Sequence, residues 1–417
     1  YLSFSGSSTV TPSLQNWTIG NSSNGAIIYS MFADCSKFNG DISGWDVYAD
    51  GTDNTKVFEN CNEFQGTGLS SSTFTLEGNC YNFFKNCTAL GNSLAIDLSS
   101  WNMTEVDHTN SFFSHTTNLG QAGFTANNWN LAKCKNVNSM FYLSFSGSST
   151  VTPSLQNWTI GNSSNGAIIY SMFADCSKFN GDISGWDVYA DGTDNTKVFE
   201  NCNEFQGTGL SSSTFTLEGN CYNFFKNCTA LGNSLAIDLS SWNMTEVDHT
   251  NSFFSHTTNL GQAGFTANNW NLAKCNSVQS MFSNSFSGSS IVTPSLQNWT
   301  IGDSGTECLI NSMFNDCSKF NGNISNWDVY GATSGNIGVF LNCISFQGNG
   351  LSSSTFTLLG NCHSFFENCT VLGNTVDIDL SSWNMTNVIY SHEFFQNASS
   401  LGMSNFTINN WDLSNCI

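Results

Sequence analysis

The sequence predicts a mainly β protein, a parallel β-solenoid of about fifteen coils. Three observations predict this fold: a long internal repeat, a short strand-like motif that recurs within each repeat, and an aromatic content of 14%. Architectures of this kind arise when each unit can bury its apolar face only against its neighbours. The length of the chain therefore reflects the number of repeats and not the number of independent domains.

The long repeat has a period of 141 residues. Residues 1–134 recur unchanged as residues 142–275, and in the diverged third copy Phe286 takes the place of Phe4. The chain starts inside a repeat and stops without a polar cap, so we expect a segment of a longer array or a subunit covered by its neighbour. We expect one continuous solenoid made of module 1 (residues 1–139), module 2 (140–280) and module 3 (281–417).

Each module divides into five coils. A coil opens with an apolar pair such as Met31-Phe32 and continues to a triplet such as Trp45-Asp46-Val47, in which two apolar residues flank a polar one. The opening pairs recur every 26 to 32 residues. Apolar-polar-apolar alternation predicts a half-buried strand, so one strand per coil would build a parallel sheet with coils about 4.8 Å apart. Any helix is expected to be a single turn near the opening pair.

The predicted core is aromatic, with 35 Phe, 12 Trp and 10 Tyr. Aligning the coils places these residues in columns, and stacked rings bury large apolar areas. An exposed strip of Trp that binds glycans is the alternative. We disfavour it because the residue between the two apolar positions of each triplet, a Thr, Asp or Asn, suits the outward-facing position better.

One motif resembles a known family. The string from Met31 to Val47 carries the pattern Met-Phe-x-x-Cys-x-x-Phe-Asn-Gly-Asp-Ile-Ser-x-Trp-Asp-Val, and it recurs from Met172 and, with Asn323 for Asp, from Met313. It is similar to the short repeats of bacterial surface lipoproteins and BspA-like leucine-rich repeat proteins. The resemblance implies a leucine-rich-repeat-like solenoid displayed outside the cell, often for adhesion, with no catalytic residues to carry over.

The charge distribution excludes one class of function. The chain has no Arg, ten Lys and 31 acidic residues, which gives a net charge of −21. Nucleic-acid binding requires clustered cations that replace the counterions of the phosphates, so we expect no nucleic-acid partner. No run of 18 apolar residues exists to span a membrane. The absence of Arg and a surface made largely of Ser, Thr, Asn and Gly favour an extracellular or cell-surface location.

An enzymatic site is not expected, and neither is a cofactor. His108 and His115 become Tyr390 and Asn397 in module 3, so a His-dependent arrangement built on one module would be lost in another. The acidic loop 50–54 resembles a calcium loop, but it becomes neutral in module 3. We interpret that loop as a solvated turn.

The sixteen cysteines leave two interpretations open, disulfides or buried thiols. Cys35 and Cys61 occupy equivalent positions in successive coils, at a separation that a disulfide tolerates. Module 3 adds Cys308 one coil after Cys275, where modules 1 and 2 have Ala26 and Ala167, so Cys275 and Cys308 form a second candidate pair.

Fourteen Asn-x-Ser/Thr sequons are candidate glycosylation sites. Their number is what the composition predicts by chance, so only their positions are informative. Asn102 lies in a strand triplet and Asn16 beside one, where both should face solvent. For Asn86 and its copies, an Asn ladder that hydrogen-bonds to the backbone of adjacent coils is an equally good interpretation. The candidates are Asn16, Asn21, Asn86, Asn102, Asn157, Asn162, Asn227, Asn243, Asn298, Asn323, Asn368, Asn384, Asn397 and Asn405.

These observations predict an extracellular structural protein, a subunit or segment of a surface filament or stalk that is glycosylated. A surface adhesin that binds proteins or glycans along its exposed strand face is the alternative. We expect the protein to associate with itself end to end, through the first coil around Phe4 and the last coil around Phe395 and Trp411.

Overall fold

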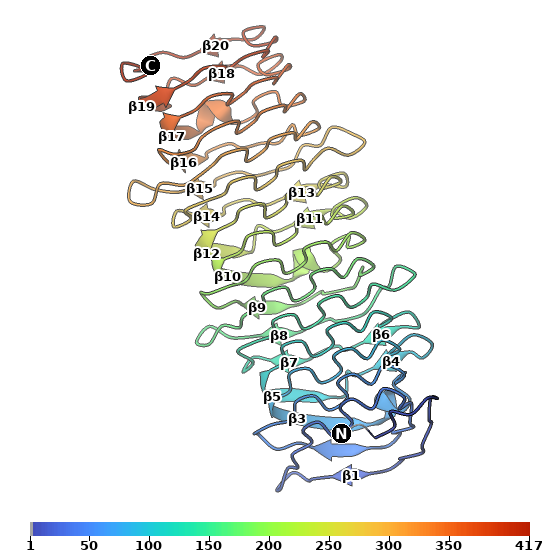
Figure 1. Ribbon diagram of the computed structural model, residues 1–417. Helices are drawn as coiled ribbons and strands as arrows, with labels where there is room; N and C mark the ends of the chain where they lie inside the picture. Colours follow the sequence, from blue (N-terminus) through green and yellow to red (C-terminus); the bar gives the residue numbers. More distant parts are fainter. Residues whose placement is uncertain (1–2) are drawn as a thin grey trace. The chain divides into compact units, whose positions relative to one another are not determined.

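The protein folds as a parallel β-solenoid of about 14 turns with almost no helix, which confirms the predicted fold class. The structure is a computed structural model that describes residues 3–417, so the first two residues of module 1 lie outside the description. The chain forms two compact units, Tyr1–Phe215 and Thr216–Ile417. Each unit is a stack of coils joined by parallel pairing (Figure 1).

Two rows of short strands follow the coils of the first unit. One row pairs in the order β1-β2-β3-β5 and continues with β7, β8 and β9, and β4 pairs with β6 in the other row. These strands are β1 (Thr18–Ile19), β2 (Asp46–Tyr48), β3 (Thr73–Asn79), β4 (Ile96–Asp97), β5 (Asn102–His108), β6 (Phe124–Thr125), β7 (Asn130–Leu131), β8 (Thr159–Ile160) and β9 (Asp187–Tyr189).

The second unit repeats this arrangement. Strands β14-β15-β16-β17-β19 form one row, β10 pairs with β12, and the other row contains the pairs β11-β13 and β18-β20. The strands are β10 (Thr214–Asn220, whose first two residues belong to the first unit), β11 (Ile237–Asp238), β12 (Asn243–His249), β13 (Phe265–Thr266), β14 (Asn271–Leu272), β15 (Thr300–Ile301), β16 (Asp328–Tyr330), β17 (Thr355–Asn361), β18 (Ile378–Asp379), β19 (Asn384–Tyr390) and β20 (Phe406–Thr407).

The pairing register differs from the predicted one at the third coil of module 1. Aligning the triplet Trp45-Asp46-Val47 with the triplet Phe74-Thr75-Leu76 of the next coil would place Val47 beside Leu76. In the structure, Val47 pairs with Phe74 and Asp46 with Thr73. The hydroxyl of Ser72 accounts for the shift, because it accepts the N–H of Trp45 at 3.1 Å and fixes the chain at that point. An irregularity after Thr75 then shifts the register again between β3 and β5.

The few helical residues do not lie at the opening pairs, where the sequence predicts them. The helices of the described chain are three single 3₁₀ turns: η1 (Leu69–Ser71), η2 (Leu210–Ser212) and η3 (Leu351–Ser353). Gly68 starts η1 with φ 94°, and a Cβ there would lie 2.2 Å from the nitrogen of Ser43, so only glycine fits. No helix within residues 3–417 has the length and hydrophobicity of a membrane span.

The aromatic columns form the core, as predicted. Phe32 and Phe58 stack with ring centroids 5.3 Å apart, and Phe58 stacks on Phe84 at the same distance. Trp45 is 2% exposed, and its indole N–H donates to the carbonyl of Leu14 at 2.5 Å. These rings lie in the offset-stacked range that aromatic pairs favour. The glycan-binding Trp strip is therefore excluded at Trp45.

Replacing Trp45 with Ala should destabilise the protein by about 3–5 kcal/mol, because a large buried ring is removed from a close-packed column. Urea unfolding followed by far-UV circular dichroism measures the change. Ile27→Ala is the control, since Ile27 is 62% exposed and its truncation should change stability little. An equal, small effect of both substitutions would show that Trp45 is not a core residue.

Candidate functional site

The turns that open the coils gather polar side chains along one edge of the stack. Ser30 and Asp34 have left-handed backbones, with φ values of 50° and 61°. Asp and Asn tolerate this conformation better than other non-glycine residues, which explains why they recur here. The N–H of Asp34 donates to the carbonyl of Glu59 in the next coil at 2.8 Å. Equivalent side chains are thereby placed directly above one another.

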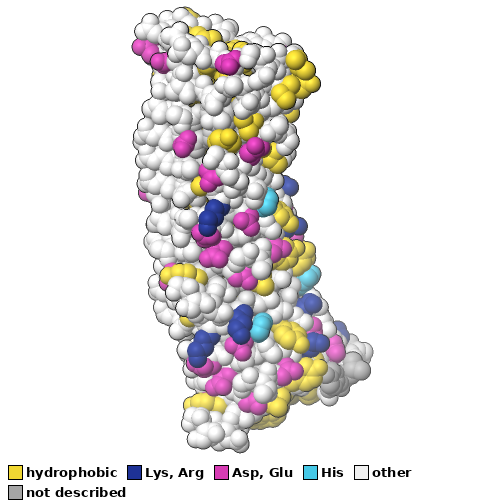
Figure 2. Space-filling view, turned by 90° about the vertical axis from the view of Figure 1, so that its left-hand side faces the viewer, with side chains coloured by type: hydrophobic (Ala, Val, Ile, Leu, Met, Phe, Trp, Pro, Cys, Tyr) yellow, Lys and Arg dark blue, Asp and Glu magenta, His cyan; other side chains and the backbone are white. Residues whose placement is uncertain are grey.

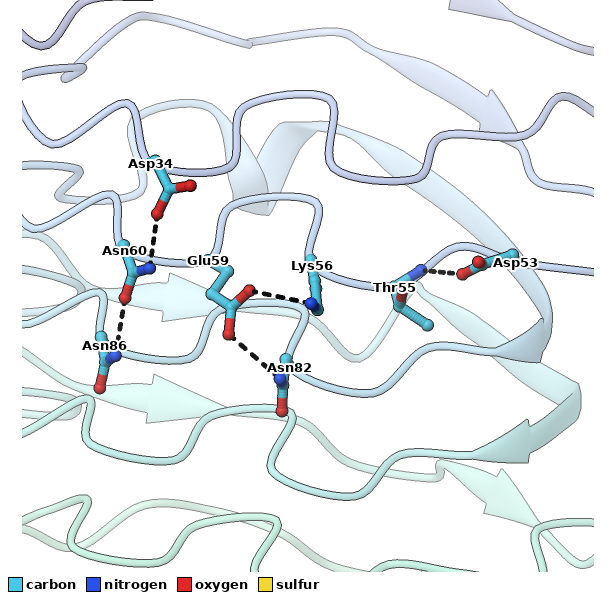
Figure 3. A network of polar contacts seen from close by, with 8 residues as sticks. All are labelled: Asp34, Asp53, Thr55, Lys56, Glu59, Asn60, Asn82 and Asn86. Atoms are coloured by element: carbon cyan, nitrogen blue, oxygen red, sulfur yellow. Dashed lines mark hydrogen bonds and ion pairs between the residues drawn. The ribbon is translucent and has the colours of Figure 1, made fainter. Parts of the chain in front are cut away.

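Amide side chains at this edge form a ladder (Figure 3). Asn60 donates from Nδ2 to Oδ1 of Asp34 at 2.7 Å, and Asn86 donates to Oδ1 of Asn60 at 2.7 Å. The same ladder recurs in module 3, where Asn342 bonds to Asp316, Asn368 to Asn342 and Asn397 to Asn368. The Asn ladder is thus real, but it joins side chain to side chain, whereas the sequence interpretation joined side chain to backbone.

An ion pair flanks the ladder in module 1. Glu59 accepts a hydrogen bond from Asn82 at 3.1 Å and lies 4.0 Å from the ammonium of Lys56. The corresponding residues of module 3 are Gly338 and Leu341, and the coil is built there without them. The charges are therefore not required for the turn, in keeping with the small contribution of exposed ion pairs.

A column of small hydrogen-bond donors lies under the turns. The thiol of Cys61 donates to the carbonyl of Phe32 in the preceding coil at 3.0 Å. A carbonyl one coil away receives the same bond in other coils, from Cys87 to Phe58, Ser144 to Phe113, Cys176 to Phe141, Cys317 to Phe282, Cys343 to Phe314 and Cys369 to Phe340.

This donor column gives a structural role to Cys61 and to the other cysteines named above. Thr116 and Ser144 hold the same position as Cys61 in other coils, so the position requires a small side chain with a donor and accepts either thiol or hydroxyl. Sequence reasoning missed this role, although the Cys-to-Ser exchange between coils was the signal. All sixteen cysteines are thiols in the described chain. The cysteines of both candidate pairs, Cys35 with Cys61 and Cys275 with Cys308, are thiols here, and Cys61 donates its thiol hydrogen to the carbonyl of Phe32.

Burial holds the thiols of Cys61 and Cys134 in their protonated form. Burial, and then the neighbouring Cys87, raise the pKa of Cys61 well above its usual range. Burial likewise raises the pKa of Cys134 to about 11. Nucleophilic attack requires the thiolate, so these buried thiols are suited to donate hydrogen bonds and are poor nucleophiles.

The sequons fall into two groups according to their amide nitrogens. Asn102 is exposed at the start of β5, and its Oδ1 accepts the N–H of Thr104. Asn86 instead donates its Nδ2 within the ladder, and a glycan attached there would break that bond. Sequon amides that donate hydrogen bonds include Asn86, Asn157, Asn162, Asn298, Asn368, Asn397 and Asn405.

The remaining polar groups do not converge on one place. Within residues 3–417, no three His, Cys, Asp or Glu side chains lie together as ligands for a metal ion. His363 and His392 stack with ring centroids 4.7 Å apart, and burial together with the His392 charge lowers the pKa of His363. On the face drawn in Figure 2, acidic and basic side chains are scattered over a mostly neutral surface.

The acidic loop 50–54, which resembles a calcium loop in sequence, forms hydrogen bonds within itself. Asp50 Oδ1 accepts the N–H and the hydroxyl of Thr52 at 2.9 and 2.6 Å. The hydroxyl bond, followed by the N–H bond, lowers the pKa of Asp50. This geometry is that of a local Asx turn, which agrees with the interpretation of a solvated turn.

Comparison with known proteins agrees with the repeated architecture. A family described as Mycoplasma protein of unknown function, DUF285, matches residues 2–94, 78–214, 219–353, 268–377 and 308–417. The chain belongs to this family. No curated protein and no solved structure matches the chain. Successive matches of DUF285 cover all three modules, so the chain is an array of this family's repeats, while the finer resemblance to BspA-like proteins stays a prediction.

The donor column of this DUF285 chain predicts that Cys61→Ser is better tolerated than Cys61→Ala. Serine keeps a donor for the Phe32 carbonyl, as Ser144 does at the equivalent position, whereas alanine loses the bond at a cost of about 1 kcal/mol. Urea unfolding of both variants and the wild type under reducing conditions measures the difference. A Ser variant less stable than the Ala variant would contradict the proposed role of the donor.

The amide ladder predicts that Asn60→Asp is destabilising by about 1–2 kcal/mol at pH 7. The variant loses the bond to Asp34 and places two carboxylates side by side. Lowering the pH to about 4 protonates carboxyl groups and should reduce the loss. Asn92→Asp is the control, because Asn92 is exposed and gains the same charge. Equal losses in both variants at both pH values would exclude the ladder as the cause.

Proposed function

We propose that the chain is an extracellular structural repeat protein, a segment of a surface filament or stalk. The observation that carries this proposal is the way one module joins the next. At the joint between modules 1 and 2, Phe113 stacks on Phe141 at 5.2 Å, and Trp129 stacks on Trp158 at 5.1 Å. The aromatic columns therefore continue across the joint without interruption.

The joint between modules 2 and 3 has the same geometry. Phe254 stacks on Phe282 at 5.2 Å, and Trp270 stacks on Trp299 at 5.0 Å. The last coil of a module is thus complementary to the first coil of another. A further copy, in the same chain or in a second one, can be added through the same contacts, and head-to-tail contacts that do not close produce filaments.

The distribution of polar groups supports a structural role. The amide ladder and the donor column recur in every module, whereas the histidines change position from module 1 to module 3. A catalytic constellation depends on a fixed set of groups. What recurs here is the set of contacts that hold coils together.

A surface adhesin is the second candidate, favoured by one groove. Tyr142, Tyr170, Asp175 and Lys197 line a hollow of about 320 Å³ at the first joint. Aromatic rings beside polar groups suit a small polar ligand such as a glycan. At the second joint the tyrosines are replaced by Ser283 and Asn311, so this groove is not a repeated feature.

Immunogold electron microscopy of the native cells tests the proposal. An antibody against the chain should label intact cells along linear surface structures, and glycopeptide analysis of the same material should find sugars on Asn102 before Asn86. Labelling that appears only after the cells are permeabilised would contradict the surface location. Punctate surface label, together with glycan binding by the wild type that Tyr170→Ala loses, would favour the adhesin.

A further inference from the structure

The joint between modules 2 and 3 carries a thiol that the other joint lacks. Cys308 stands where modules 1 and 2 have Ala26 and Ala167. Cys275 lies in the preceding coil, and both side chains are completely buried. The joint between modules 2 and 3 thus has a thiol on each side, whereas the joint between modules 1 and 2 has one thiol only at these positions.

The backbone brings the two cysteines side by side. Ser277 and Leu309 form a parallel bridge, and the N–H of Leu309 donates to the carbonyl of Asn276 at 2.9 Å. Cys275 and Cys308 are close neighbours of these bridged residues in adjacent coils. Burial, and then the interaction with the Cys275 side chain, raise the pKa of Cys308 well above its usual range, in agreement with this backbone placement.

The first joint is a control built into the sequence. Asn136 and Ile168 form the same bridge there, and the N–H of Ile168 donates to the carbonyl of Lys135 at 3.0 Å. Cys134 and Ala167 hold the positions of Cys275 and Cys308 there, and the backbone pairing is the same. A second thiol is therefore not needed to build the joint. What Cys308 adds is a reactive group that the first joint lacks.

Cys308 also differs from the donor column. Cys61 donates to a carbonyl of the preceding coil at 3.0 Å, and hydroxyl residues replace it in other coils. The Cys308 thiol lies 3.9 Å from the carbonyl of its own neighbour Leu309. The residue that Cys308 replaces is alanine, which has no donor. The bond to the preceding coil that accounts for Cys61 therefore does not account for Cys308.

We propose that Cys275 and Cys308 form a disulfide that links module 2 to module 3. The oxidant is a small-molecule disulfide, and the reaction takes place before the joint buries both thiols. One cysteine thiolate attacks the small disulfide and releases one small thiol. The second cysteine thiolate then attacks the mixed disulfide and releases the other thiol. Two protein thiols are oxidised, one small disulfide is reduced, and the two cysteine protons end on the released thiols.

Peptide mapping of the full chain tests the link. The chain is refolded with oxidised and reduced glutathione, alkylated in guanidinium without reductant, digested and analysed by mass spectrometry. We expect a linked peptide containing Cys275 and Cys308, and the loss of two of the sixteen thiols from alkylation. The oxidised chain should also unfold at a higher temperature than the reduced chain.

Two variants make the result decisive. Cys308→Ala restores the residue found in modules 1 and 2, so it should fold, lose the linked peptide and lose the temperature difference. Ala167→Cys reproduces the pair at the first joint and should gain a second linked peptide with Cys134. A wild-type chain that keeps all its thiols, or links Cys317 to Cys343 in place of the proposed pair, would overturn the proposal.

Discussion

Hydrogen bonding between the backbones of successive coils is the constraint on which the structure depends. It operates in the strands and also in the turns, where the N–H groups of Ser30 and Phe32 donate to the carbonyls of Thr55 and Val57 at 2.9 and 2.7 Å. Buried backbone groups must be paired, and here the partner lies one coil away. Each residue is consequently fixed above its equivalent in the next coil. Whether a side chain stabilises the fold therefore depends on how well it stacks on a similar side chain.

This stacking rule selects the residue types. Phenylalanine, asparagine and small donors each form favourable columns, as Phe32, Asn60 and Cys61 show. A column of one charge repels itself, and Glu77 does pair in register with Glu105. Lys133 in the following coil forms an ion pair with Glu105. The charged fraction of only 10% is what this rule predicts for a stack of similar coils.

Much of the fold could be predicted because the repeat aligns the coils without a structure. The period, the aromatic columns and the outward position of Asn102 all follow from that alignment. The register at Val47 and Phe74 could not be predicted, because it depends on the hydroxyl of Ser72 and not on the apolar pattern. The donor role of Cys61 was also missed, because the acceptor is a backbone carbonyl that no sequence pattern marks.

Comparing module 3 with module 1 shows which residues change together and which side chains the fold does not require. Glu77, Glu105 and Lys133 become Leu359, Asn387 and Asn415 as a set, and the strands β17 and β19 still pair with the register of β3 and β5. Replacing all three removes two negative charges and one positive charge, so neither Glu nor Lys is left without its partner. The charged side chains can therefore vary between modules, while the aromatic columns and the coil-to-coil hydrogen bonds, which recur in every module, determine the fold.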